Sequence, residues 1–175
     1  FTIDHFSAAY EATTYLIARG HTRIGFIRGK QTIKDSEDRY FGFKKALDEN
    51  RIPHEKTMCF QGDLEESSGK DAARYFLKEL TGERPTAVFS ANDQMAMGFL
   101  SELPALGVTC PKDISVIGFD GVDAGRYTMP PLTSVRQPGY DMAKAAVTEL
   151  IDLIDHNKSF VGTRYFKAKI IERGS

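Results

Sequence analysis

Short apolar segments alternate with longer segments of helical period along most of this chain. The apolar segments are rich in β-branched and aromatic residues and occupy positions 24–29, 57–63, 86–93 and 114–120. Strands that are apolar throughout are buried on both faces, and the stretches between them are long enough for right-handed crossover helices. The pattern therefore predicts an α/β fold, with a doubly wound and mostly parallel sheet and helices on both faces.

Helices are expected where apolar residues recur every three or four positions, which happens at 7–19, 36–50, 66–80, 93–106 and 139–156. Asp63 and Glu66 have the spacing of a capping box before the third of these helices. At the two ends of the chain we expect a short strand at 1–3, a loop at 156–163 and a last strand at about 164–171.

The charge and composition argue against several classes of protein. Hydrophobic residues make up 41% and charged residues 27% of the chain, a balance typical of globular domains. The formal net charge is −1, so the chain lacks the basic surface by which a domain grips DNA. No apolar run approaches the ~18–20 residues of a membrane span, and no export signal opens the chain. We expect a cytoplasmic protein whose DNA contacts, if any, are made by another segment.

Signatures of catalysis and metal binding are missing from the sequence. No glycine-rich nucleotide loop, phosphate-binding loop or serine nucleophile elbow follows a predicted strand. The four histidines are dispersed without the spacing of a metal site. Cys59 and Cys110 are expected to be free structural thiols. We therefore expect no cofactor, no metal and no enzymatic activity.

Polar residues follow the predicted strands at their carboxyl ends, where open parallel sheets bind ligands. They are the loop at 29–38, then Arg39, Asp63, Asn92, Asp93, Asp120 and Gln137. Carboxylates accept hydroxyl protons, asparagine both donates and accepts, and arginine donates as a planar fork. The set suits a neutral sugar or polyol.

Two alternatives remain for these residues. Aspartate and asparagine also cap helices, and for Asp63 and Asp93 capping is the favoured interpretation. For Asn92 and Asp120 both interpretations stay open; Asp120 stands in a glycine-flanked turn that lets the backbone approach a ligand. A magnesium site at Asp63, Asp93 and Asp120 is conceivable, but the same setting is equally suited to hydroxyl groups.

Six segments, in order along the whole chain, resemble the lactose-repressor/galactose-repressor (LacI/GalR) family of bacterial transcription regulators. They are GHTRIGFIRG (20–29), the Ser36-x-x-Arg39-x-x-Gly42-Phe43 motif, PTAVFSANDQMAMG (85–98), PKDISVIGFDG (111–121), PPLTSVRQP (130–138) and ERGS (172–175). One such segment would be a weak match, but six in register are specific.

The resemblance implies a DNA-binding headpiece, a hinge helix and two similar lobes of the periplasmic-binding-protein type, with the effector bound between the lobes. Residues 1–136 would form the C-terminal lobe, 137–160 the helix returning to the N-terminal lobe, and 161–175 the final strand of the C-terminal lobe. The headpiece and most of the N-terminal lobe would lie outside this chain.

The resemblance also implies roles for individual residues. Arg39, Asn92 and Asp120 match positions that hydrogen-bond the effector, and Leu64 stands where many members place an aromatic ring that stacks on it. Further contacts would come from Asp35, Ser36 and Gln137. Subunits of the family pair through the C-terminal lobe, and the matching positions here are Met97, Leu100 and Tyr127, although core packing is an alternative for the apolar residues of that helix.

These inferences predict the ligand-sensing domain of a bacterial repressor. A sugar, or alternatively a purine, would act as effector and control operator binding by a homodimer, through the headpiece and not through this chain. The alternatives are a periplasmic sugar-binding protein, which shares the two-lobed fold, and a nucleotide- or metal-using enzyme.

Overall fold

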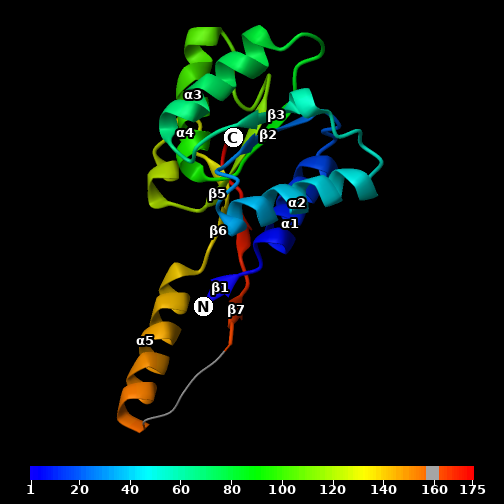
Figure 1. The fold of residues 1–175 in the computed structure, drawn as a ribbon. Helices are drawn as coiled ribbons and strands as arrows, with labels where there is room; N and C mark the ends of the chain where they lie inside the picture. The colour runs from blue at the N-terminus through cyan, green and yellow to red at the C-terminus, as the bar shows by residue number, and fades with distance from the viewer. Residues whose placement is uncertain (157–161) are drawn as a thin grey trace.

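The fold is built around a six-stranded sheet (Figure 1). The computed structural model describes residues 1–156 and 162–175. Within them the strand order is β3-β2-β4-β5-β6-β8, and only β8 runs antiparallel to its neighbour. The strands are β2 (Ile24–Arg28), β3 (Cys59–Gln61), β4 (Ala87–Ser90), β5 (Ser115–Asp120), β6 (Thr133–Arg136) and β8 (Lys169–Ile171). The predicted fold class is confirmed.

Helices cover both faces of this sheet, as the sequence predicts (Figure 1). They are α1 (His5–Ala18), α2 (Lys34–Glu49), α3 (Glu66–Arg74), α4 (Asp93–Glu102) and, apart from the sheet, α5 (Gly139–His156). The chain crosses the sheet in one direction through α2 and in the other through α3 and α4. Right-handed crossovers therefore put α2, with α1 packed along it, on one face and α3 and α4 on the other.

The centre of the core is a group of phenylalanine rings on the face covered by α1 and α2. Phe26 of β2 stacks on Phe43 of α2 with ring centroids 4.7 Å apart, and its ring meets Phe89 of β4 at 5.2 Å. Phe89 in turn lies 6.4 Å from Phe119 of β5. All four are at most 1% exposed, and burial of such large side chains is a main source of stability.

On the opposite face, α3 and α4 approach each other backbone to backbone. A Cβ atom placed on Gly69 would lie 2.0 Å from the carbonyl oxygen of Met95, and one on Gly98 would lie 2.0 Å from that of Glu66. Only glycine permits this contact. The close crossing fixes where α4 begins, and with it the residues that follow β4.

The ends of α3 and α4 differ from the expected form. Helix α3 begins after Glu65 without a side-chain cap, while the Asp63 carboxylate accepts a hydrogen bond from the Glu65 N–H at 2.9 Å. The predicted capping box of Asp63 and Glu66 is therefore wrong, because Asp63 lies two residues before the cap position. Helix α3 continues as a π-helical turn at Tyr75–Glu79, and α4 as a 3₁₀ turn at Leu103–Leu106.

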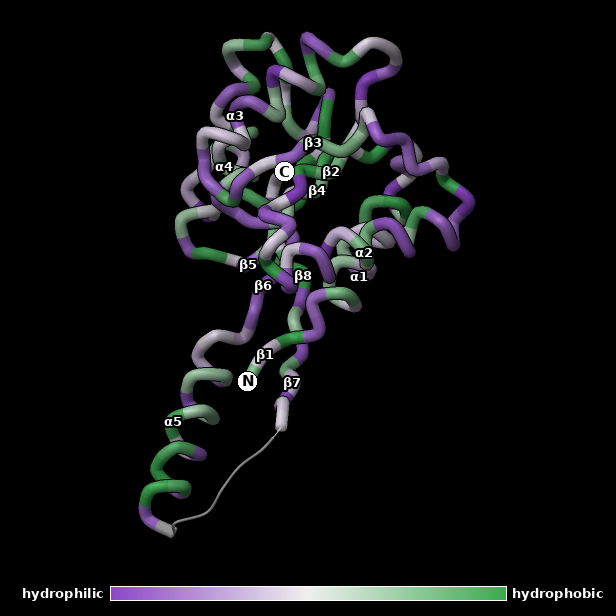
Figure 2. The backbone as a smooth tube through the Cα atoms, in the orientation of Figure 1, coloured by the Kyte–Doolittle hydropathy of each residue, from purple (hydrophilic) through white to green (hydrophobic). Residues whose placement is uncertain are grey.

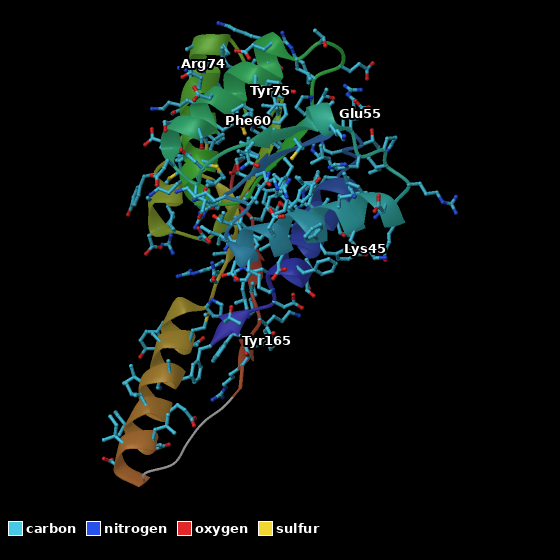
Figure 3. The ribbon with its side chains drawn as sticks, viewed as in Figure 1. Lys45, Glu55, Phe60, Arg74, Tyr75 and Tyr165 are labelled. Carbon is cyan, nitrogen blue, oxygen red and sulfur yellow. The ribbon has the colours of Figure 1, made fainter. Side chains whose placement is uncertain are left out.

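A separate two-stranded sheet lies outside the main one. Strand β1 (Thr2–Ile3) pairs in parallel with β7 (Tyr165–Phe166), and the exposed Tyr165 is seen beside β1 in Figure 3. The single last strand predicted at 164–171 is instead β7 followed by β8, because the chain passes there from one sheet to the other. Residues 157–161 of the predicted loop lie outside the described residues.

Helix α5 extends away from the body, as Figure 1 shows, and carries a hydrophobic stripe that Figure 2 shows in green. Its large apolar side chains include Val147, Leu150, Ile151 and Ile154, which are 51–70% exposed. In the part of the chain that the structure describes, no helix combines the length and apolar character needed to cross a membrane.

Candidate functional site

The carboxyl ends of β2, β4, β5 and β6 bring the predicted site residues to one edge of the sheet. Arg39 lies on α2, Asn92 precedes α4, Asp120 ends β5 and Gln137 follows β6. Two of these side chains meet at Asp120. Its Oδ1 lies 3.5 Å from Arg39 Nη2 and accepts a hydrogen bond from Gln137 Nε2 at 2.8 Å.

The Arg39 guanidinium is buried against the sheet. Its Cζ lies 3.9 Å from the centroid of the Phe119 ring, and Nη1 donates to the carbonyl of Ala91 at 2.5 Å. Burial lowers the pKa of Arg39, an effect that Asp120 opposes. An arginine still remains a cation in this setting. Arg39 thus presents a positioned positive charge with further N–H groups available to a ligand.

Asp120 combines a strained backbone with a half-buried carboxylate. Its φ of +117° lies in a region that residues other than glycine rarely adopt. Burial raises the pKa of Asp120, while Arg39 and the hydrogen bond from Gln137 lower it. Strained residues of this kind persist where the surroundings hold them, and they concentrate at ligand sites.

Asp93 and Ser134 hold the turn that follows Asp120. Asp93 Oδ2 accepts from the N–H of Val122 at 2.8 Å, and Asp93 Oδ1 accepts from Ser134 Oγ at 2.6 Å. Ser134 Oγ in turn accepts from the N–H of Gly121 at 3.1 Å. Asp93 is completely buried, and this burial raises its pKa to about 6. The capping interpretation of Asp93 is wrong, because its carboxylate is bonded to the β5 turn.

Asn92, not Asp93, caps α4. Its Oδ1 accepts from the N–H of Met95 at 3.0 Å, and its Nδ2 donates to the carbonyl of Leu64 at 2.8 Å. The capping interpretation of Asn92 is therefore confirmed. An amide has a second lone pair and a second N–H, so the predicted ligand contact stays a prediction.

Leu64, Ser36 and Gly29 pack together at this edge. A Cβ on Gly29 would lie 2.4 Å from both Leu64 Cδ2 and Ser36 Oγ, so the two side chains close over the glycine. Leu64 also has a positive φ, of 76°. The buried Ser36 Oγ has no hydrogen-bond partner among the described residues. A left-handed leucine and an unpartnered hydroxyl are both unusual.

His5 is a member of this group that the sequence reasoning missed. Its Nδ1 lies 3.3 Å from Arg39 Nε, and its Nε2 lies 3.2 Å from Asp35 Oδ2. The ring is 6% exposed and lies 5.8 Å from that of Phe119. The sequence placed His5 two residues before the first helix, whereas α1 begins at His5 because Asp4 caps it. No spacing rule links positions 5, 35 and 39.

A cavity of about 500 Å³ lies beside Gln137, between the start of α5 and the β7–β8 segment. Its lining includes Arg136, Gln137, Tyr140, Phe166, Lys167 and Lys169. Gln137 thus connects the polar edge to a hollow that faces α5. Within residues 1–156 and 162–175, no cluster of three or more histidine, cysteine or acidic residues has the arrangement of a metal site.

The residues predicted at a dimer interface lie in different environments. Leu100 is 3% exposed and packs in the core of the lobe, Met97 is half-buried, and Tyr127 is 87% exposed. Among the three, Tyr127 offers the most surface to a partner. The interface itself stays a prediction.

The fold is an α/β fold with a mostly parallel sheet flanked by helices, and polar side chains gather at the carboxyl ends of its strands. The chain matches the model of the periplasmic binding protein-like domain over residues 13–175, and it belongs to this family.

The relatives of the chain are transcription regulators. The HTH-type transcriptional repressor PurR of Yersinia pestis is 40% identical over 170 residues, which cover 97% of this chain and 49% of PurR. The Escherichia coli transcriptional repressor AscG is 31% identical with a TM-score of 0.90, covering 99% of this chain and 62% of that chain. The transcriptional regulator CelR, in its cellobiose complex, is 31% identical with a TM-score of 0.90, covering 99% and 52%.

These comparisons confirm the resemblance to the LacI/GalR family that the six segments indicated. They favour a regulator over a periplasmic transport protein, since the relatives are repressors and regulators. The chain spans about half the length of the curated relatives that it matches.

Proposed function

We propose that this chain is the effector-sensing part of a bacterial LacI/GalR-type repressor, and that the effector binds at the edge formed by Arg39, Asn92 and Asp120. The observation that carries the proposal is the meeting of Arg39 and Gln137 on Asp120, a residue in a left-handed backbone conformation. Two opposite charges and one amide converge at the place where open parallel sheets bind ligands.

The chemistry of the edge favours a neutral ligand with several hydroxyl groups. Arg39 and Asp120 have opposite charges and supply donors and acceptors side by side, with Asp35, Ser36 and Gln137 adding further polar groups. Leu64 supplies an apolar surface but no aromatic face, which favours a sugar over a purine because planar bases gain from ring stacking. The cellobiose bound to the related CelR supports the same choice.

The exposed apolar side chains of helix α5 support a second lobe. We propose that residues 1–136 and 161–175 belong to the C-terminal lobe and that 137–160 return to an N-terminal lobe. The exposed Leu150 and Ile154 would be buried there. Operator DNA would be bound by a headpiece in the remaining half of the protein, in the cytoplasm, and a homodimer would form through the region of Met97 and Tyr127.

The proposed mechanism is binding and not catalysis. An effector that touches both lobes favours their closed arrangement, and the strands that cross between the lobes carry this change toward the headpiece. Effector and operator then alter each other's affinity, typically by ~1–3 kcal/mol.

Thermal-shift screening of a chain that also carries the proposed N-terminal lobe tests this proposal. The panel contains mono- and disaccharides, purines, nucleotides and Mg²⁺, and Arg39→Gln is compared with a matched surface variant, Arg23→Gln. We expect a sugar to raise the melting temperature of the wild type and of Arg23→Gln but not that of Arg39→Gln. Stabilisation by nucleotides or Mg²⁺ alone would overturn the proposal.

A further inference from the structure

We propose that His5 is a positioning residue of the effector site, and that its neutral imidazole holds Arg39 in place and ties it to the crossing strand β1. The proposal rests on the function proposed above, because that function makes Arg39 an effector-binding residue. The contacts of His5 themselves are a property of the unliganded chain.

His5 stands between two parts of the molecule. It is the first residue of α1, two residues beyond β1, which pairs outside the main sheet. Its ring lies in the lobe, on the same Phe119 ring that carries the Arg39 guanidinium. A shift in the direction of β1 therefore moves the imidazole, and the imidazole is in direct contact with Arg39.

The hydrogen bonds of His5 define its tautomer. Arginine Nε can only donate, so Nδ1 of His5 must accept from Arg39 across the 3.3 Å contact. The proton of the neutral ring then lies on Nε2, which is 3.2 Å from the Asp35 carboxylate. Only the neutral ring with its proton on Nε2 satisfies both neighbours. A protonated ring would direct a second donor at the Arg39 donor.

The charges around His5 come from two helices. Asp4 on the α1 cap and Asp35 and Asp38 on α2 favour the imidazolium, whereas Arg39 disfavours it. Burial is the largest influence, and together with Arg39 it lowers the pKa of His5. The amino-terminal end of α1 is also unfavourable for a positive charge. Burial and Arg39 therefore keep the ring neutral at neutral pH.

The Arg39–Asp120 contact consequently depends on His5. Arg39 is held by Ala91 at Nη1 and by His5 at Nε, which leaves Nη2 directed at Asp120. Loss of the Nε contact frees the guanidinium to rotate on Phe119. We expect the site to lose its preformed geometry when His5 is protonated or replaced by a residue without an acceptor.

NMR of the ¹⁵N-labelled protein tests the proposal without any ligand. In the wild type we expect the His5 ring nitrogens to report the neutral Nε2–H tautomer at pH 7, and the Arg39 Nε signal to shift in step with His5 during acid titration. A cationic ring at pH 7, an Nδ1–H tautomer, or an Arg39 signal that ignores His5 would overturn the proposal.

Two variants of His5 separate its acceptor from its ring. His5→Phe keeps a ring on Phe119 and removes the acceptor, while the Oδ1 of His5→Asn retains it. We expect hydrogen exchange at Arg39 Nε to become about tenfold faster in His5→Phe, the effect of losing one hydrogen bond to a charged group, and to be largely restored in His5→Asn. His21→Phe, at a histidine that contacts Thr86 instead, should leave the rate unchanged. Equal rates in His5→Phe and the wild type would contradict the proposal.

The two proposals fail in distinguishable ways. If the thermal-shift panel yields no sugar while Arg39 responds to His5, the proposed effector fails and the positioning role stands. If His5→Phe does not fold, the wild-type titration alone decides the positioning role.

Discussion

The Nη2 atom of Arg39 lies 3.5 Å from Oδ1 of Asp120, although one residue comes from α2 and the other from the end of β5. The side chains are only 10% and 31% exposed, respectively. Because Arg39 also lies on Phe119 and donates to Ala91, its position is determined before any ligand arrives. Preorganised polar groups of this kind are what a specific small-molecule site needs.

Removing the buried guanidinium of Arg39 should lower the stability of the folded protein substantially. Arg39→Met leaves the Asp120 carboxylate half-buried without its cation and the Ala91 carbonyl without its donor. We expect the free energy of unfolding to fall by about 2–3 kcal/mol in urea. Arg23→Met, which removes an exposed pair with Glu83, should cost less than about 1 kcal/mol. Equal losses in the two variants would contradict the buried role of Arg39.

Asp93 should make the protein less stable as the pH rises from about 4 to 7. Its pKa is raised from 3.8 to about 6 in the folded chain, so the folded state retains a proton that the unfolded state has already released. The resulting stabilisation is complete below pH 4 and is lost as the pH passes 6, a change of about 3 kcal/mol.

Comparison with Asp93→Asn isolates this effect, because the amide is nearly isosteric and does not titrate. We expect the stability of the wild type relative to Asp93→Asn to decline steadily over that pH range in urea unfolding experiments. A difference that is independent of pH would show that the Asp93 carboxylate is not perturbed.

Gly29 should be intolerant of a methyl group. A Cβ there would lie 2.4 Å from Leu64 Cδ2 and from Ser36 Oγ, so Gly29→Ala must displace both side chains from the site edge. We expect a loss of about 1–3 kcal/mol in unfolding free energy, as for other overpacked sites. Gly139→Ala, where nothing lies within 4 Å of the added atom, should be neutral or slightly stabilising. Equal effects of Gly29→Ala and Gly139→Ala on the unfolding free energy would indicate that Leu64 does not pack closely on Gly29.

The apolar stripe of α5 should matter only where the second lobe is present. Leu150→Lys in the 175-residue chain changes an exposed position, and we expect an effect below about 0.5 kcal/mol. In a longer chain that carries the proposed N-terminal lobe the same change would bury a charge, and a loss of at least about 2 kcal/mol is expected. Thr148→Lys on the same helix serves as the control in both proteins. A neutral Leu150→Lys in the longer protein would count against the proposed lobe contact.

The sheet and the pairing of Arg39 with Asp120 could be predicted from the sequence, because both follow from local patterns. Continuous apolar segments identify parallel strands, and the carboxyl ends of such strands meet at one edge. Arg39, Asp120 and Gln137 could therefore be expected to lie close together. Their proposed role in effector binding came from the family resemblance of the six ordered segments.

Other features depend on contacts between distant residues and have no local signal. From the sequence Asp93 is expected to cap a helix, but the Val122 N–H and Ser134 hydroxyl that bind it come from later strands and turns. The role of His5 depends on Arg39 and on the Phe119 ring in the same way. The positive φ of Leu64 likewise could not be foreseen, since leucine rarely adopts it.

Isothermal titration calorimetry with the stabilising sugar tests the proposed effector site most directly. A chain that carries both proposed lobes would be compared with its Asp120→Asn variant and with Asp71→Asn, a matched change on the exposed side of α3. We expect Asp120→Asn to weaken binding by about 10–100-fold, because it removes a charged acceptor and leaves ligand hydroxyls unmatched, and Asp71→Asn to bind as the wild type does. Unchanged affinity in Asp120→Asn would contradict the placement of the effector at this edge.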